Sequence, residues 1–173
     1  RKIYCNGMVR ALSIKIIPNF LKEETFNELS NILLNNSFPW FYSDISGGPG
    51  DYSNFFFQHW FYLEGRQNSE WFGKVAIPIL GSLDFKSLIR VKANCYSQRD
   101  KEIITRFHID DTNPHTVALY SLNTNNGYTL FENGEKVHSV ANQMIMFDGS
   151  LKHASVSQTD TAIRVNVNFN LIL

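Results

Sequence analysis

Apolar positions follow two different spacings along the chain, and the change between them comes about halfway. Residues 12–17 form a short apolar run that predicts a strand. Over residues 21–36, apolar side chains recur at the spacing of an amphipathic helix. A second helix is predicted over residues 69–80, with Ser69 as its N-cap and Pro78 kinking or ending it. The N-terminal half is therefore expected to supply helices that pack outside the main body of the fold.

From Leu88 to Leu173 the pattern is one of short strands. Segments rich in Val, Ile, Phe, Tyr and Thr alternate with turn signals such as "NTNNG", "ENGE" and "FDGS". Many short strands at this spacing are typical of an antiparallel barrel or a double-sheet jelly roll. We therefore predict a mostly β fold with flanking α-helices, built on a double-stranded β-helix of the cupin-like jelly-roll type. Because there are no internal repeats or linker-like segments, residues 1–173 are predicted to form one domain, with helical support over about 1–87 and the jelly-roll core over about 88–173.

The composition narrows the classes of function. The 173 residues are 43% hydrophobic and 14% aromatic, as in a folded soluble protein of one domain's size. Sixteen basic and 16 acidic side chains leave no net charge, so a nucleic-acid partner is not indicated. Cys5 and Cys95 form no C-x-x-C pair, which argues against a disulfide framework or a zinc knuckle and favours a reducing, cytoplasmic location. No apolar run has the roughly 18 residues that a membrane span needs, so no membrane partner is expected.

The stretch "TRFHIDDTNPH", residues 105–115, concentrates metal-binding side chains. If it is extended, His108 and Asp110 project from the same face and offer an imidazole and a carboxylate to one point. An H-x-D motif alone arises easily by chance. A later histidine, His153, lies between two predicted strands, which a barrel would bring beside the motif. Two histidines and one carboxylate leave coordination positions open and suit non-haem Fe(II) that must bind a co-substrate and O₂. His115 is the rival to His153 as a ligand.

Two predicted strands each place polar residues on one face. In the last strand Arg164, Asn166, Asn168 and Asn170 alternate with apolar residues. An earlier strand repeats this alternation with the polar residues Arg90, Lys92, Asn94 and Tyr96. A buried arginine is costly unless an anion meets it, and its planar guanidinium suits a carboxylate. We therefore expect Arg164 to bind a carboxylate in the barrel interior, with Asn94 and Tyr96 adding hydrogen bonds.

In these residues the chain resembles the Fe(II)- and 2-oxoglutarate-dependent dioxygenases, in particular the prolyl-4-hydroxylase-like branch of microbial and phage type. The resemblance spans roughly residues 90–169, and its motif is H-x-D, then a distant H, then R. It implies that His108, Asp110 and His153 are the catalytic iron ligands. It further implies that Arg164 binds the distal carboxylate of 2-oxoglutarate and that Tyr96 is the co-substrate tyrosine.

The chain departs from the family pattern at two places. Some hydroxylases have a second tyrosine in "YYLN", where this chain has "LYSLN" and therefore Ser121. A contact from Ser121 to the co-substrate would be shorter or mediated by water. The N-x-Y and R-x-N patterns, which include Asn94 and Asn166, are similar to those of the nucleic-acid demethylase branch. The rest of that branch's R-x-N-x-T-x-R motif is missing, since Asn168 and Asn170 occupy the later positions.

The resemblance implies a two-stage reaction with Fe(II), 2-oxoglutarate as co-substrate and O₂. Oxidative decarboxylation yields succinate and CO₂ and is coupled to hydroxylation of a peptidyl, prolyl-like or small-molecule C–H bond. Asp110 argues against a halogenase, which usually replaces this carboxylate to admit halide. The alternatives are a nucleic-acid oxidative demethylase, against which the neutral charge argues, and a non-catalytic jelly-roll module that binds a metal or ligand.

The substrate is expected to meet loops at the mouth of the barrel. These are residues 43–54, which are rich in glycine, and residues 97–105. The aromatic run over residues 55–63 is interpreted either as core or as one wall of a substrate entrance, with His59 or Trp60 touching the substrate.

Overall fold

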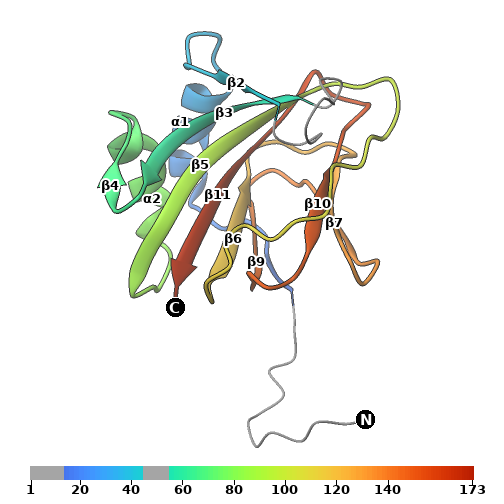
Figure 1. Cartoon of the computed structure of the whole chain (residues 1–173). Coiled ribbons are helices and arrows are strands. Elements are labelled where there is room, and N and C mark those ends of the chain that lie inside the picture. Colours follow the sequence, from blue (N-terminus) through green and yellow to red (C-terminus); the bar gives the residue numbers. More distant parts are fainter. Residues whose placement is uncertain (1–13, 45–54) are drawn as a thin grey trace, which may run out of the picture.

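The computed structural model describes residues 14–44 and 55–173 as a set of antiparallel strands with a few short helices (Figure 1). The elements in chain order are β1 (Lys15–Ile17), α1 (Glu23–Leu33), β2 (Phe41–Ser43), β3 (Phe56–Leu63), β4 (Arg66–Gln67), the π-helical turn η1 (Phe72–Ala76), α2 (Ile77–Leu80), β5 (Ser87–Ser97), β6 (Thr116–Ser121), β7 (Tyr128–Phe131), β8 (Lys136–His138), β9 (Gln143–Asp148), β10 (His153–Val156) and β11 (Ile163–Ile172). The start of the predicted strand over residues 12–17 and most of the predicted loop over residues 43–54 lie outside the described residues.

The strands form two antiparallel sheets. The larger sheet has the order β1-β9-β6-β11-β5-β3-β2, with β4 paired to β3, and the smaller one has the order β10-β7-β8. Two isolated bridges, Ile104 to Val156 and His108 to His153, join the connection between β5 and β6 to the smaller sheet. The prediction of a mostly β, double-sheet fold with flanking helices is confirmed, although the two sheets do not close into one continuous barrel.

The helices cover one face of the larger sheet (Figure 1). Leu29 and Leu33 of α1 are buried against the apolar face of β5 and β11. The helix is shorter than the predicted span of 21–36. Before its first residue, the backbone C=O of Leu21 accepts a hydrogen bond of 2.9 Å from Nδ2 of Asn142, whereas a helix that began at Leu21 would direct this carbonyl to the N–H four residues later. The part of the chain that the structure describes contains no helix long and apolar enough to cross a membrane.

Only part of the second predicted helix is an α-helix. Its span over residues 69–80 contains η1 followed by the four-residue α2. Ser69 is not the N-cap of η1, which is Trp71 and has no side-chain cap; Oγ of Ser69 accepts the backbone N–H of Trp71 at 3.1 Å in the turn before η1. Pro78 has no N–H to donate to the carbonyl four residues before it, and the turn ahead of it widens to π-helical hydrogen bonding. The predicted kink is therefore a change of helix type.

Strands β5 and β11 are paired so that their polar faces coincide. The register places Tyr96 opposite Arg164, Asn94 opposite Asn166, Lys92 opposite Asn168 and Arg90 opposite Asn170. Residues directly opposite in an antiparallel pair project to the same side of the sheet. The alternating apolar residues of both strands pack in the core on the helical side. The resulting polar ladder therefore lies on the side away from the helices.

Candidate metal and co-substrate site

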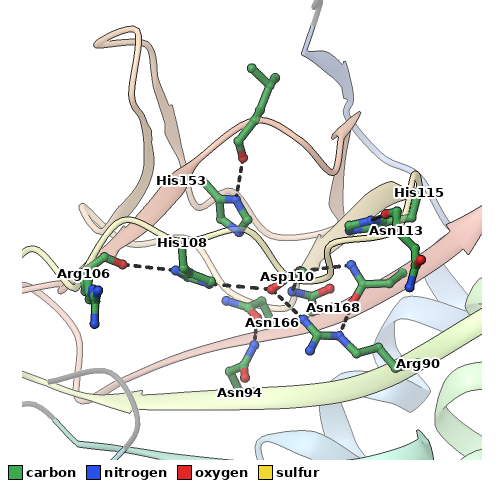
Figure 2. Close-up of polar contacts among 12 residues, drawn as sticks. Arg90, Asn94, Arg106, His108, Asp110, Asn113, His115, His153, Asn166 and Asn168 are labelled. Atoms are coloured by element: carbon green, nitrogen blue, oxygen red, sulfur yellow. Dashed lines mark hydrogen bonds and ion pairs between the residues drawn. The ribbon is translucent and has the colours of Figure 1, made fainter. Parts of the chain in front are cut away.

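The three predicted metal ligands converge between the two sheets. His153 is the first residue of β10, and its backbone N–H and C=O exchange hydrogen bonds of 3.0 Å with the backbone of His108. Asp110 lies two residues after His108 in the connection between β5 and β6. One ligand atom from each of the three residues lies within 4.8 Å of the others. Figure 2 shows the three side chains grouped together. The segment from Thr105 to Asp110 is irregular, not a full strand, but the expected grouping of the side chains holds.

Backbone carbonyls orient both imidazoles. Nδ1 of His108 lies 3.1 Å from the carbonyl oxygen of Arg106, and Nδ1 of His153 lies 3.0 Å from that of Leu151. A carbonyl only accepts, so each Nδ1 carries the proton and each Nε2 keeps its lone pair. This is the arrangement that fixes metal-binding histidines. Burial lowers the pKa of His153, although the Asp110 charge opposes this, so the ring is held in its neutral, ligating form.

Four side chains surround the Asp110 carboxylate. Oδ1 forms an ion pair of 2.6 Å with Arg90 and lies 3.6 Å from Nε2 of His108. Oδ2 accepts hydrogen bonds from the Nδ2 groups of Asn168 at 2.9 Å and Asn170 at 3.0 Å. Burial would raise the pKa of Asp110, but the neighbouring His108 and the Arg90 charge outweigh it and hold the pKa well below its usual range. The carboxylate is therefore charged and fixed in orientation.

Arg164 is a buried cation whose hydrogen bonds go to neutral groups. Its side chain donates from Nε to Oγ of Ser139 at 2.8 Å, and from Nη1 to Oγ of Ser155 at 2.8 Å and to the carbonyl of Val156 at 3.0 Å. Its guanidinium carbon lies 5.4 Å from the ring centroid of Tyr96. Within residues 14–44 and 55–173 no carboxylate lies within 4.0 Å of it. A cation held in this way favours binding of an anion.

Gly127 makes room for this arginine. A Cβ atom at position 127 would lie 3.0 Å from Cδ of Arg164 and 2.9 Å from Oδ1 of Asn125. Any larger residue would therefore have to displace the Arg164 side chain or the turn that faces it.

Asn94, Tyr96 and Asn166 line the same small cavity as Arg164 and the three candidate ligands, of about 50 Å³. Asn94 donates from Nδ2 to Oδ1 of Asn166 at 2.8 Å, while Oδ1 of Asn94 is buried with no hydrogen-bond partner. Ser121 lies beside Asn166 in the pairing of β6 with β11 and is buried, but Leu119 lines the cavity from that strand instead. The structure thus brings three of the four predicted auxiliary residues to the cavity.

Two other histidines lie apart from the ligand set. His115 is buried, with Nδ1 2.7 Å from the carbonyl of Asn113, and Figure 2 shows it to one side of the cluster. His59 is enclosed between the carbonyl of Pro39 and Oγ of Ser69, both at 2.7 Å. Trp60, the next residue, projects to the opposite side and lines a larger cavity that adjoins the small one.

The sequence analysis assigned no role to Arg90, Asn168 or Asn170 at the metal site. All three hold Asp110, and all three stand on the alternating polar faces that the sequence displays. The alternation of polar and apolar residues was therefore the only sign in the sequence that these side chains face a polar site. The pairing register that brings them to Asp110 is a property of the folded sheet. Of the predicted loop over residues 97–105, Thr105 lines the larger cavity.

Comparison with solved structures supports the same fold. The viral collagen prolyl hydroxylase of Paramecium bursaria Chlorella virus-1, in its 2-oxoglutarate complex, is 15% identical with a TM-score of 0.59, over 96% of this chain and 100% of that one. A Trichoplax adhaerens prolyl hydroxylase in complex with a hypoxia-inducible-factor peptide is 17% identical with a TM-score of 0.64, over 95% and 85%. An oxidoreductase of the 2OG-Fe(II) oxygenase family from Burkholderia pseudomallei is 11% identical with a TM-score of 0.62, over 94% and 87%.

The chain therefore has the jelly-roll fold of the 2-oxoglutarate- and Fe(II)-dependent oxygenases, and prolyl hydroxylases are among the structures it is similar to. The resemblance predicted from the sequence is confirmed at the level of the fold. No protein-family model matches the sequence, and no curated protein matches it.

Proposed function

We propose that this protein is a non-haem Fe(II)- and 2-oxoglutarate-dependent oxygenase that hydroxylates a C–H bond of a peptidyl or small-molecule substrate. One observation supports this above the others. The same cavity is lined by a convergent His108, Asp110 and His153 cluster and by Arg164, a buried cation that makes no ion pair within the described ranges. A metal site and a carboxylate site side by side are what a chelating keto acid needs.

The donor set fits iron. Two imidazoles and one carboxylate form the ligand set typical of non-haem Fe(II) oxygenases and leave positions open for other ligands. The three donors are already oriented by carbonyls, amides and Arg90, so little rearrangement of side chains is needed on binding. Bound iron would supply the O₂-dependent decarboxylation of 2-oxoglutarate to succinate and CO₂ that drives hydroxylation.

The protein's own contribution is positioning. Arg164 would bind the distal carboxylate of 2-oxoglutarate, and the Tyr96 ring beside its guanidinium limits where that carboxylate can sit. Asn94 and Asn166, joined by their own hydrogen bond, fix the floor of the cavity. Leu119 and Ala154 line the cavity as well and reduce the space for water.

A second candidate function, oxidative demethylation of nucleic acid, is favoured by one arrangement. Asn94 and Tyr96 stand directly opposite Asn166 and Arg164, so the N-x-Y and R-x-N patterns meet in one cavity. The absence of net charge argues against it, because phosphate contacts need a basic surface. Salt-dependent binding of single-stranded DNA would favour this function over the first. A non-catalytic jelly-roll module would be favoured instead if metal and 2-oxoglutarate bound without turnover.

An anaerobic optical titration tests the main proposal. We expect a metal-to-ligand charge-transfer band only when both Fe(II) and 2-oxoglutarate are present. The band should be lost in His108→Ala and should require at least tenfold more 2-oxoglutarate in Arg164→Ala. Arg66→Ala, which removes an exposed arginine outside the site, is the matched control. If no band forms in the unmodified protein, the oxygenase proposal is wrong.

A further inference from the structure

A larger cavity lies next to the proposed metal site. It has a volume of about 650 Å³, and His108, Asp110, Tyr96 and Lys92 line both this outer cavity and the small one. One wall comes from β3 and β5 of the larger sheet. The other comes from residues 105–110, which are bridged to the smaller sheet. A volume of this size accommodates a small molecule or a few side chains of a peptide. It therefore offers a substrate a route to the proposed metal.

The lining of the outer cavity is basic although the chain is neutral overall. Among the lining residues that the structure describes, four are basic, namely Arg90, Lys92, Arg106 and Lys152, and one, Asp110, is acidic. Arg90 is paired with Asp110 and Lys152 with Glu132. Neither Lys92 nor Arg106 has a carboxylate within 4.0 Å among the described residues. Two positive charges thus face the cavity without a direct ion pair, and the nearest acidic lining residue, Asp110, is already paired with Arg90.

Lys92 is placed to bind an anion deep in the cavity. Its Nζ lies 5.3 Å from the ring centroid of Trp60 and 5.7 Å from that of Phe56. A partly desolvated ammonium between rings attracts an anion more strongly than an exposed one does. On the other wall, Phe107 and Ile109 are 37% and 38% exposed, unusually open for apolar side chains that line a cavity. Apolar surface on both walls and a cation on the floor favour a substrate that has both an apolar part and a negatively charged group.

We propose that the outer cavity binds a substrate that carries a carboxylate or phosphate on an apolar body, with Lys92 binding the acidic group and Trp60 and Phe107 enclosing the apolar part. This inference rests on the proposed oxygenase function, because it names the substrate class of the same site. Arg106, at the rim, would add long-range attraction for the acidic group.

Matched acidic and neutral probes test this substrate class. Binding is measured by isothermal titration calorimetry on the full chain with Zn(II) and saturating 2-oxoglutarate, so that the Arg164 anion site is already filled. The pairs are 3-phenylpropionate with its amide, phenyl phosphate with phenol, and a glutamate-containing aromatic hexapeptide with its glutamine version. They distinguish a small acid from an acidic peptide. The variants are Lys92→Met, Lys92→Arg and the control Lys74→Met, which removes an exposed lysine over another tryptophan ring.

We expect the acidic member of at least one pair to bind at least tenfold more tightly than its neutral partner. Lys92→Met should reduce that preference to less than threefold, while Lys92→Arg and Lys74→Met should retain it. The inference is overturned if neutral and acidic probes bind equally well, or if the preference survives Lys92→Met.

Succinate formation from 2-oxoglutarate with Fe(II) and O₂, measured in parallel without a substrate and in His153→Ala, separates the two proposals. If turnover occurs but no acidic probe is preferred, the substrate class is wrong and the oxygenase function stands. If there is no turnover but the Lys92-dependent preference is present, the binding site stands and the oxygenase function is wrong.

Discussion

Asp110 has few free lone pairs, because Arg90, Asn168 and Asn170 all bind its carboxylate. The two asparagines act on the oxygen that does not face His108, and they hold the other oxygen toward the imidazoles. Charge alone would let a carboxylate rotate, whereas two amide donors on one oxygen fix its plane. The asparagine pair is thus as important to the ligand geometry as the arginine.

We expect Asn170→Ala to weaken metal binding about tenfold, because loss of an outer hydrogen bond to a ligand typically costs this much affinity. Asn170 is fully buried and also accepts a hydrogen bond from Arg90, so both contacts are lost together. The measurement is a Mn(II) titration followed by electron paramagnetic resonance. Asn133→Ala, at an exposed turn, is the control. Unchanged Mn(II) affinity in Asn170→Ala would show that Arg90 and Asn168 alone are enough to orient the Asp110 carboxylate.

Among the elements, the segment that leads into α1 is hydrogen-bonded to one asparagine, in addition to the packing of the helix itself. The side chain of Asn142 exchanges hydrogen bonds of 2.9 Å with the backbone N–H and C=O of Leu21, and it accepts another from the Tyr120 hydroxyl. Its backbone has a positive φ of 57°, which asparagine tolerates better than most residues. The start of the helical layer is therefore fixed to the turn before β9.

Asn142→Ala should lower the free energy of unfolding by about 3 kcal/mol, since buried partners lose their hydrogen bonds and alanine is strained at positive φ. Asn19 provides a matched control, because it has a positive φ of 48° but is exposed. Asn19→Ala should cost only about 1 kcal/mol, the contribution of backbone strain. Urea unfolding of both variants measures the difference, and equal losses would rule out the hydrogen bonds as the cause.

At this scale the sequence predicts element type better than element pairing. The alternation in residues 90–96 and 164–170 identifies two strands with one polar face each, and the structure confirms both. Which residue lies opposite which depends on contacts between distant segments, so the Arg90 contact with Asp110 has no local signal. Residues 69–80 were predicted as one helix with Pro78 kinking or ending it, but Pro78 removes a donor and the segment consists of η1 followed by α2.

For the molecule as a whole, the polar ladder between the sheets has a cost in stability. Burial lowers the pKa of Lys92 to about 8, even though the Asp110 charge opposes the shift. In the unfolded chain the pKa returns to about 10.5. Between pH 8 and pH 10.5 the unfolded state binds more protons at Lys92 than the folded state does, so the free energy of unfolding rises with pH. Below about pH 8 the folded protein bears the full cost of burying the charged lysine.

Lys92→Met should therefore stabilise the protein at pH 7 by up to about 3 kcal/mol, and most of this gain should disappear at pH 10. Urea unfolding of the variant and the unmodified protein at the two pH values gives the comparison. A gain of equal size at both would mean that methionine packs better than lysine for reasons unrelated to charge.

Arg164 joins the two sheets as well as facing the small cavity. It belongs to β11 of the larger sheet, whereas Ser155 and Val156, which accept its hydrogen bonds, belong to β10 of the smaller one. The same side chain would then bind the co-substrate and hold the two sheets together. A lineage of such proteins could not adopt a co-substrate without a distal carboxylate by replacing this arginine alone, because the same replacement would loosen the fold. A second change on the smaller sheet would have to accompany it.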